Sequence, residues 1–433
     1  MNDQRDMGVA VLAAFFIAGC TTTDPYRTSF GEFCEFERAP DCAEQVMNVS
    51  ALDSVEEYRL SFIEYDDQGQ LNVPEAQKIV TDAYREIAEE SGILLMVFVH
   101  GWHHNANGEP EDANIASFRE ILRQASENEK RVRAITGKPR RKVLGVYIGW
   151  RGTSLNGFLN YFTFWARKAT AHEVGDQGMT EVLLELEQIV KQNKAKHSQS
   201  RMITIGQSFG GAALFSSLHP VLSERYVSSR PYKTTQAAEG FGDLVVLLNP
   251  AFEAIRYGSL YDLSRDECRE YPETQLPKLI ILTSHADMFV RWFFPIGRLP
   301  GSLVESHRTT PAIYCPKNGI EHYELNQWDA DIHAVGHFDS YLTHVLDARA
   351  GAKSSISNGG NIDPKEAWLS QIESERGSVV FNGSVLISKG RTRPNNPYMN
   401  IFTTKDVMSG HNDIWNEVVS SFLSDLIRIS TAE

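Results

Sequence analysis

The 433-residue sequence lacks an excess of basic residues, an internal repeat and a long low-complexity segment. Acidic residues outnumber basic ones by 56 to 42, and the formal net charge is −14. Because a protein binds nucleic-acid phosphates through a basic face, this balance argues against a nucleic-acid partner. The composition is 42% hydrophobic and 23% charged, which is typical of a folded chain with a large core and excludes disorder.

The N-terminal apolar run is too short to cross a membrane. It spans Val9–Ala18, whereas a bilayer requires about 20 residues. The run ends in the sequence IAGC, and small residues before a cleavage point are typical of a secretory signal. IAGC resembles the lipobox of bacterial lipoproteins. The resemblance implies that residues 1–20 are a signal peptide and that Cys20 is lipidated. It also implies a cell-envelope protein facing the periplasm, at the outer rather than the inner membrane because Thr21 follows the cysteine. The alternative is a buried N-terminal helix with a free cysteine.

Cysteines are few, and their spacing does not indicate zinc. There is no CxxC pair and no Cys/His pattern typical of a zinc site. Without Cys20 four cysteines remain, and in an oxidising compartment they can form two bridges in three pairings. We expect Cys34–Cys42 as the local pair, and Cys268–Cys315 would then join the flanks of a strand around Ile280. Buried free thiols are the alternative.

Apolar runs alternate with amphipathic stretches along most of the chain. The strands expected from these runs are Glu57–Tyr65, Ile93–Val99, Val143–Ile148, Met202–Ile205, Leu244–Leu248, Leu279–Leu282 and Tyr398–Phe402. The expected helices are Glu75–Ser91, Ala113–Asn128, Thr180–Lys194, Gly210–Leu218 and Trp415–Ile427. Strands that are apolar on both faces and alternate with helices predict an α/β fold with a doubly wound, mostly parallel sheet.

Two regions do not follow this alternation. Residues 21–50 are predicted to be an irregular lead-in, and residues 51–433 to be one domain. Residues of about 298–368 are rich in Gly, Pro, Ser and His, and we interpret them as an insertion that forms a cap over the sheet edge.

The segment Gly206–Gly210 reads GQSFG and lies between a predicted strand and a predicted helix. At such a sharp turn Ser208 takes a strained backbone conformation, and the flanking glycines relieve crowding. The helix N-terminus behind it favours developing negative charge. We therefore predict that Ser208 is a nucleophile; the alternative is a glycine-rich turn whose serine only caps the helix that begins at Phe209.

A second motif, His100-Gly101-Trp102, directly follows the strand Ile93–Val99. With VFVHGW and GQSFGG, the chain from roughly Glu57 onward resembles the α/β-hydrolase superfamily, and most closely its esterase- and lipase-like members. The resemblance implies an α/β-hydrolase fold in which the backbone N–H groups of Trp102 and Phe209 hold an oxyanion. Each such donor can lower the barrier by about 3 kcal/mol.

The loop after this strand also contains three crowded histidines, His100, His103 and His104. They lack good ligand spacing and an obvious carboxylate partner, so we predict no metal site and expect His100 to shape the loop.

A serine nucleophile needs a histidine base and an acid that orients the histidine. In the family the acid precedes the histidine, and Asp287 follows the strand Leu279–Leu282 as expected. Glu253, one strand earlier, is the alternative acid. His411 lies between the last strand and the last helix and is the predicted base; His337, in the predicted insertion, is the alternative.

Two aromatic-rich segments, Tyr161–Ala169 and Phe289–Gly297, allow three interpretations. They can pack in the core, line an acyl pocket, or lie on a lid that faces a membrane.

The sequence thus predicts an exported serine hydrolase that cleaves a carboxylic ester through Ser208, Asp287 and His411 with no cofactor. The expected partners are a small-molecule or lipid-like ester and, through the N-terminal anchor, a membrane. An acyltransferase or thioesterase would use the same triad. A binding or scaffold lipoprotein that keeps the fold without turnover is the alternative from another class.

Overall fold

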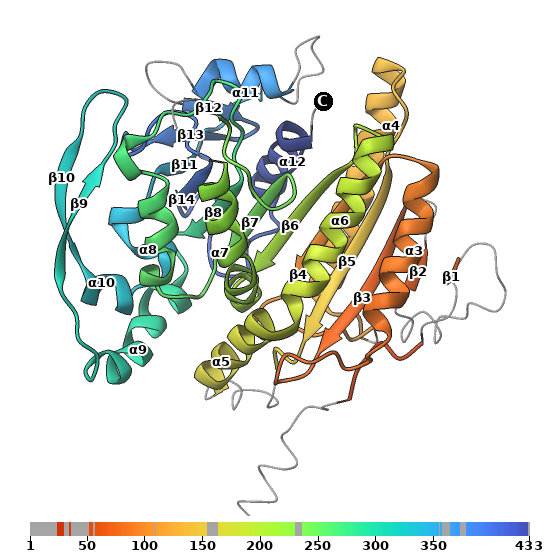
Figure 1. Cartoon of the computed structure of the whole chain (residues 1–433), viewed down its shortest axis with the longest axis horizontal. Coiled ribbons are helices and arrows are strands. Elements are labelled where there is room, and N and C mark those ends of the chain that lie inside the picture. The colour runs from red at the N-terminus through yellow and green to blue at the C-terminus, as the bar shows by residue number, and fades with distance from the viewer. Residues whose placement is uncertain are drawn as a thin grey trace, which may run out of the picture.

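The structure is built on one large sheet in which the carboxyl ends of adjacent parallel strands lie along the same edge (Figure 1). The computed structural model describes residues 24–29, 34–35, 52–54, 57–108, 110–153, 163–229, 236–354, 356, 364–372 and 378–431. The predicted signal peptide with Cys20 and most of the predicted lead-in lie outside these residues, as does Cys42 of the predicted pair Cys34–Cys42.

In the described part of the chain the main sheet has twelve strands, in the order β1-β2-β3-β5-β4-β6-β7-β8-β14-β11-β13-β12. Their bounds are β1 Cys34–Glu35, β2 Leu52–Ser54, β3 Tyr58–Tyr65, β4 Ile93–Val99, β5 Lys142–Trp150, β6 Arg201–Gln207, β7 Leu244–Leu248, β8 Leu279–Ser284, β11 His344–Ala348, β12 Ser378–Phe381, β13 Ser384–Ser388 and β14 Tyr398–Thr403. All pairs from β3 through β11 are parallel. β2 is antiparallel to β3 but parallel to β1, and β13 is antiparallel to both β11 and β12. The predicted mostly parallel α/β sheet is therefore confirmed.

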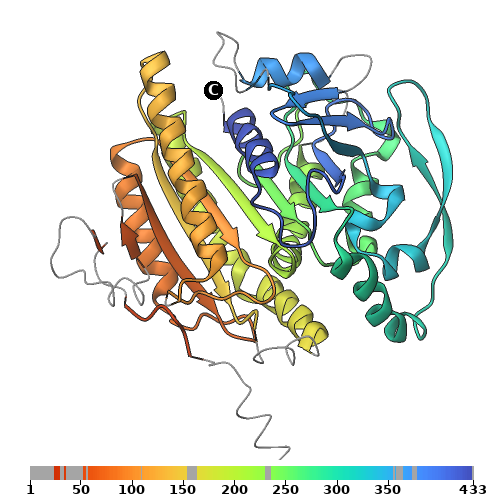
Figure 2. The same ribbon diagram turned by 180° about the vertical axis from the view of Figure 1, so that it is seen from behind.

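Helices cover both faces of this sheet, which is why β4, β6, β7 and β8 are buried along their whole length and why β4 and β7 are apolar throughout. One face packs against α3 (Ala76–Glu90), α6 (Thr180–Lys196), α7 (Phe209–Ser228) and α8 (Ala254–Leu263), in front of the sheet in Figure 1. The other face packs against α4 (Ala113–Thr136), α11 (Pro364–Ile372) and α12 (Glu417–Thr431), and Figure 2 shows α4 and α12 in front. None of the described helices is long and apolar enough to cross a bilayer.

The winding of the chain reverses between β4 and β6, which are direct neighbours in the sheet. After β4 the chain enters α4 on one face, and after β6 it enters α7 on the opposite face. The loops that follow the two strands therefore diverge at the carboxyl edge. In open parallel sheets such a switch point is where ligands bind.

The region between β8 and β14 departs from the regular alternation. It contains α9 (Phe294–Ser302), a separate hairpin of β9 (Thr309–Tyr314) and β10 (Glu321–Asn326), α10 (Gln327–Ile332) and the strands β11 to β13. Within the predicted insertion at 298–368, β11 is a strand of the main sheet, paired with β14. The predicted disulfide Cys268–Cys315 is confirmed, and it joins the end of β9 to the segment before β8.

Candidate functional site

Ser208 occupies a sharp turn between β6 and α7. Its backbone has φ 54° and ψ −120°, a conformation that non-glycine residues rarely adopt. The turn is held in place by its own backbone: the Ser208 N–H donates to the Leu248 carbonyl at 2.9 Å, and the Ser208 carbonyl accepts from the N–H groups of Ala212 and Ala251 at 3.1 Å each. This strained turn projects the hydroxyl at the carboxyl edge, and Ser208 is only 3% exposed.

The two glycines of GQSFG are required by close packing. A Cβ atom on Gly210 would lie 2.3 Å from the carbonyl oxygens of Val99 and His100, and one on Gly206 would lie 2.9 Å from the Cα of Gly211. Since these contacts are with backbone, they cannot be relieved by a side-chain rotation. The pattern G-x-S-x-G thus allows α7 to approach the end of β4 closely.

Three side chains from distant parts of the chain form a continuous hydrogen-bonded series at this edge. His411 Nε2 lies 2.8 Å from Ser208 Oγ, and His411 Nδ1 lies 2.6 Å from Asp287 Oδ2. A carboxylate can only accept, so His411 donates its Nδ1–H to Asp287 and presents Nε2 as an acceptor for the serine hydroxyl. The structure therefore brings together the predicted nucleophile, base and acid in the geometry that proton abstraction from Ser208 needs.

Asp287 is fully buried at the end of β8. Burial alone would raise the pKa of its carboxyl, but the adjacent His411 and the Val290 N–H, which donates to Oδ1 at 3.0 Å, hold the pKa below its ordinary value. The carboxylate therefore stays ionised at neutral pH and accepts the Nδ1–H of His411.

Asn249, which sequence reasoning missed, connects the histidine loop to the sheet. Its backbone has φ 44°, and its side chain is fully buried after β7. Its Nδ2 donates to the His411 carbonyl at 2.7 Å, and its Oδ1 accepts from the Ser284 N–H at 2.8 Å. Ser284 Oγ in turn donates to the Met408 carbonyl at 2.6 Å. Polar residues at the carboxyl ends of buried strands are the sequence signal that would have indicated Asn249 and Ser284.

The loop after β4 lies against the serine turn, as the ring contact between Trp102 and Phe209 at 6.1 Å shows. Phe209 is the first residue of α7, so its N–H has no acceptor within the helix and lies at the positive end of the helix dipole. Trp102, the other predicted oxyanion donor, is buried at the same edge.

His100 shapes this loop through both ring nitrogens. Its Nε2 accepts from the Trp150 N–H at 2.9 Å, so its Nδ1 donates to the Gly101 carbonyl at 2.9 Å. Burial lowers the pKa of His100 to about 4, which keeps the ring neutral. The prediction that the loop histidines lack a carboxylate partner is wrong for His104, whose Nδ1 lies 2.9 Å from Asp112 Oδ1.

The two alternative triad residues have other surroundings. Glu253 is buried beside Lys168 and forms an ion pair with it, while Arg256 Nε lies 3.1 Å from the other carboxylate oxygen. Although burial opposes it, this positive charge lowers the pKa of Glu253 to about 2. His337 is half-buried near Asp287, and its Nε2 has no hydrogen-bond partner among the described residues.

One further cluster of charged side chains is held together by ion pairs. Glu305, His307 and Asp331 place possible ligand atoms within 4.8 Å of one another. The guanidinium of Arg298 already reaches Glu305 at 2.7 Å and Asp331 at 2.9 Å, so this group is an ion-pair network.

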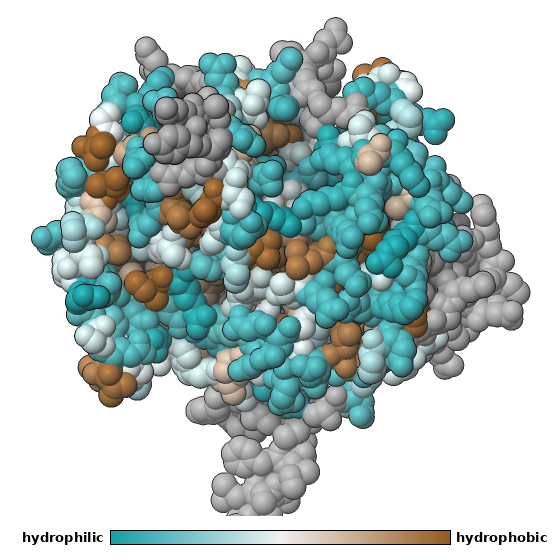
Figure 3. Space-filling view, in the orientation of Figure 1, coloured by the Kyte–Doolittle hydropathy of each residue, from teal (hydrophilic) through white to brown (hydrophobic). Residues whose placement is uncertain are grey.

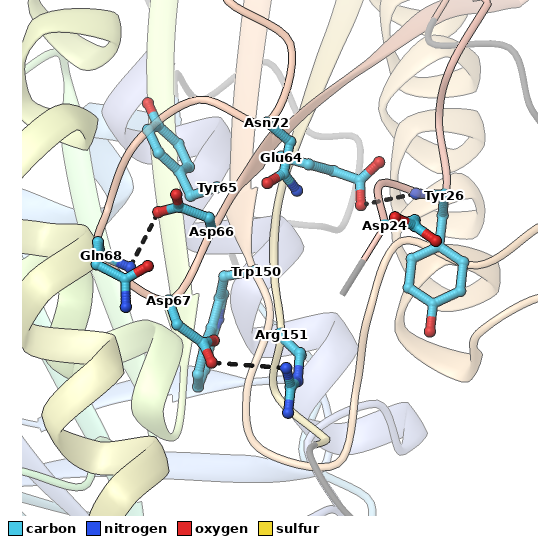
Figure 4. Close-up of a pocket in the computed structure, with 10 residues that line it drawn as sticks. All are labelled: Asp24, Tyr26, Glu64, Tyr65, Asp66, Asp67, Gln68, Asn72, Trp150 and Arg151. Atoms are coloured by element: carbon cyan, nitrogen blue, oxygen red, sulfur yellow. Dashed lines mark hydrogen bonds and ion pairs between the residues drawn. The ribbon is translucent and has the colours of Figure 1, made fainter. Parts of the chain in front are cut away.

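A cavity of about 170 Å³ lies at the carboxyl ends of β3 and β5 (Figure 4). Arg151 lines this cavity and points toward Asp67 at 3.7 Å, and Glu64 accepts from the backbone N–H of Tyr26 at 3.2 Å. Asp24 also lines the cavity, so the described chain begins at the same edge that carries Ser208.

Comparison with protein-family models, with curated proteins and with solved structures gave no significant match.

Proposed function

We propose that this protein is an exported serine hydrolase with an α/β-hydrolase fold that cleaves a carboxylic ester. The observation that carries the proposal is the series of hydrogen bonds from Ser208 through His411 to Asp287, built on a strained strand-to-helix turn. A serine with this backbone, an aligned base and a buried, ionised acid has the parts that nucleophilic catalysis requires.

In this proposal Ser208 Oγ attacks the ester carbonyl carbon while His411 Nε2 takes its proton. Asp287 keeps the imidazole in the required tautomer and stabilises its charged form. The backbone N–H groups of Trp102 and Phe209 would hold the negative charge that develops on the carbonyl oxygen. His411 then returns the proton to the leaving alcohol, and a water molecule releases the acyl group from Ser208 by the same route.

Export and lipid attachment at Cys20 are part of the proposal and are supported by the IAGC motif alone. Mass analysis of the N-terminus of the protein from its own host tests them directly. A processed chain that begins with a lipidated Cys20 is expected, and an intact Met1 with an unmodified Cys20 would contradict this localisation.

The test of the activity is a screen of p-nitrophenyl esters of graded acyl length. We expect Ser208→Ala to lower kcat by roughly 10⁴-fold or more at the best acyl length. Ser216→Ala is the matched control, because Ser216 also lies in α7 and its Oγ is 2.8 Å from the Nδ1 of His172.

The histidine that contacts the control serine, His172, is poorly suited to act as a base. The Nε2 of His172 has no hydrogen-bond partner among the described residues, and burial lowers the pKa of this histidine to about 3. Ser216→Ala should therefore keep the activity of the unaltered protein. If the folded protein cleaves no ester of the series, the proposed hydrolase activity is wrong and the scaffold alternative is favoured.

A further inference from the structure

A row of exposed apolar side chains follows directly after Asp287. Among the described residues, more than half of the large hydrophobic side chains that are exposed lie in this one segment: Met288, Trp292, Phe293, Ile296, Leu299, Leu303 and Val304. We call these seven residues the ridge. Trp292 is 53% exposed, Phe293 59% and Ile296 64%, whereas Val290 and Phe294 of the same segment are buried.

The ridge has the spacing of one helical face. Met288, Trp292, Ile296, Leu299 and Leu303 recur every three or four residues through a π-helical turn, Phe289–Phe293, and α9. Figure 3 shows hydrophobic surface at the lower left, where the end of this segment lies in Figure 1. Large exposed apolar side chains gathered on one helical face are typical of an interaction site.

The ridge borders the candidate active site. The ring of Phe289 lies 5.9 Å from the ring of His411 and 6.4 Å from that of Trp102. A molecule that covers the ridge would therefore lie next to the entrance to Ser208.

Positive charge accompanies the ridge although the whole chain is acidic. Arg291 lies over the Trp292 ring at 5.4 Å, and Arg308 is exposed just beyond the ridge. Among the described residues no carboxylate forms an ion pair with either arginine. The guanidinium of Arg291 donates instead to the ring Nε2 of His285 at 3.0 Å and to its carbonyl at 3.3 Å. Exposed Trp and Phe beside these two arginines match the boundary between acyl chains and anionic headgroups.

The start of the described chain lies at the same edge of the sheet. Asp24 and Tyr26 line the cavity at the carboxyl ends of β3 and β5 (Figure 4), and the ridge begins beyond the carboxyl end of β8. Cys20 lies four residues before Asp24, a stretch that an extended chain covers in about 14 Å. A lipid on Cys20 would thus hold this edge, and not the opposite one, close to a membrane.

We propose that the ridge docks the protein on the surface of a phospholipid bilayer. Trp292, Phe293 and Ile296 enter the headgroup boundary, and Arg291 and Arg308 contact lipid phosphates. The site of Ser208 then opens toward the lipid phase, which makes membrane lipid esters its substrate class. The substrate assignment rests on the proposed hydrolase activity, and the orientation argument on the proposed lipidation; the docking surface itself requires neither.

The test is binding of the full chain to vesicles of phosphatidylethanolamine and phosphatidylglycerol, measured by sedimentation. The variant Trp292→Ser/Phe293→Ser/Ile296→Ser should bind at least about tenfold more weakly. The matched control is Val132→Ser/Ile135→Ser, which removes two exposed apolar side chains near the end of α4, at the opposite edge of the sheet, and should bind like the unaltered protein. Residues 1–20 are present in every variant, so any contribution they make to vesicle binding is the same in each.

A second readout reports insertion at the ridge itself. Brominated lipids should quench part of the tryptophan fluorescence, and Trp292→Phe should remove most of this quenching while binding persists. Arg291→Gln/Arg308→Gln should weaken binding to these vesicles but not to vesicles of phosphatidylcholine alone.

Equal binding by the ridge variant and the unaltered protein, or equal loss in the α4 control, would overturn the proposal. Each binding measurement is repeated with Ser208→Ala, which should bind unchanged. Binding that depends on the ridge, without ester hydrolysis, would therefore reject the hydrolase while supporting the docking surface. Hydrolysis of soluble esters without ridge-dependent binding would support the hydrolase and reject the docking surface.

Discussion

Replacement of Asn249 tests whether the buried amide positions the base. The side chain donates to the His411 carbonyl and accepts from the buried Ser284 N–H, so its removal leaves both groups without these bonds. At about 1–3 kcal/mol for each unsatisfied group, Asn249→Gly should lower the free energy of unfolding by roughly 3 kcal/mol. Because glycine accepts a φ of 44° without strain, this variant isolates the side chain from the backbone.

Two further variants separate the contributions. Asn249→Ala removes the same bonds and also places a Cβ-bearing residue without a local hydrogen bond at positive φ, which should cost about 1 kcal/mol more. Asn249→Asp keeps the acceptor for the Ser284 N–H but cannot donate to the His411 carbonyl while it is ionised.

The assay is steady-state hydrolysis of the best p-nitrophenyl ester beside urea unfolding of each variant. Displacement of His411 by about 1 Å would lower kcat by roughly 100-fold, and KM should change little because the predicted oxyanion donors are untouched. All three variants should show this loss. If Asn249→Gly is destabilised but keeps the kcat of the unaltered protein, Asn249 supports the fold without positioning the base.

Three other predictions concern the surrounding structure. Glu253→Gln leaves the charge of Lys168 buried and unpaired, so it should lower the free energy of unfolding by about 3–5 kcal/mol and keep kcat. Asp287→Asn should instead lower kcat by roughly 10⁴-fold. A large loss of kcat in Glu253→Gln and none in Asp287→Asn would identify Glu253 as the acid. Loss of the Cys268–Cys315 bridge, which spans 47 residues, should lower the unfolding free energy by about 4 kcal/mol in a double serine variant, and an unchanged urea midpoint would contradict this. Burial lowers the pKa of four histidines, to about 4 for three of them and to about 3 for the fourth, so only the unfolded chain binds their protons as the pH falls from 6.5 toward 4. The free energy of unfolding should therefore be constant above pH 7 and lower by roughly 1–2 kcal/mol per histidine at pH 5. Equal urea midpoints at pH 7 and pH 5 would refute this. The four are His100, His337 and His344, at about 4, and His172, at about 3.

The buried strands could be predicted because a strand covered on both faces must be apolar throughout. Ile93–Val99 and Leu244–Leu248 have the predicted bounds, since polar or glycine residues flank each run. Helix ends were harder to predict. The helix expected at Gly210–Leu218 continues to Ser228 through Pro220, and Leu222 and Tyr226 are buried beyond the proline. Tertiary packing outweighs the local cost of the proline there.

The region before β14 could not be derived from periodicity. The strands β11 to β13 are short, and α9 carries apolar residues on its exposed face, so neither has a clean alternation of apolar and polar positions. The helix α5 (Phe164–Val174) was likewise missed because its aromatic residues hide any amphipathic spacing.

The candidate site could be predicted where chemistry dictates residue type. Ser208, Asp287 and His411 each follow a predicted strand, and the carboxyl ends of parallel strands meet at one edge. Asn249 acts through hydrogen bonds of its amide to the backbone of the His411 loop and of the end of β8, and such contacts require the register of the neighbouring strands to be known.

The central claim, that His411 and Asp287 activate Ser208, is tested most directly by labelling the folded protein with a fluorophosphonate and locating the adduct by tandem mass spectrometry. We expect one adduct, on Ser208, that is lost in Ser208→Ala, forms at least 100-fold more slowly in His411→Ala, and is retained in Ser216→Ala. A folded protein that takes up no label, or takes it up at another residue, would contradict it.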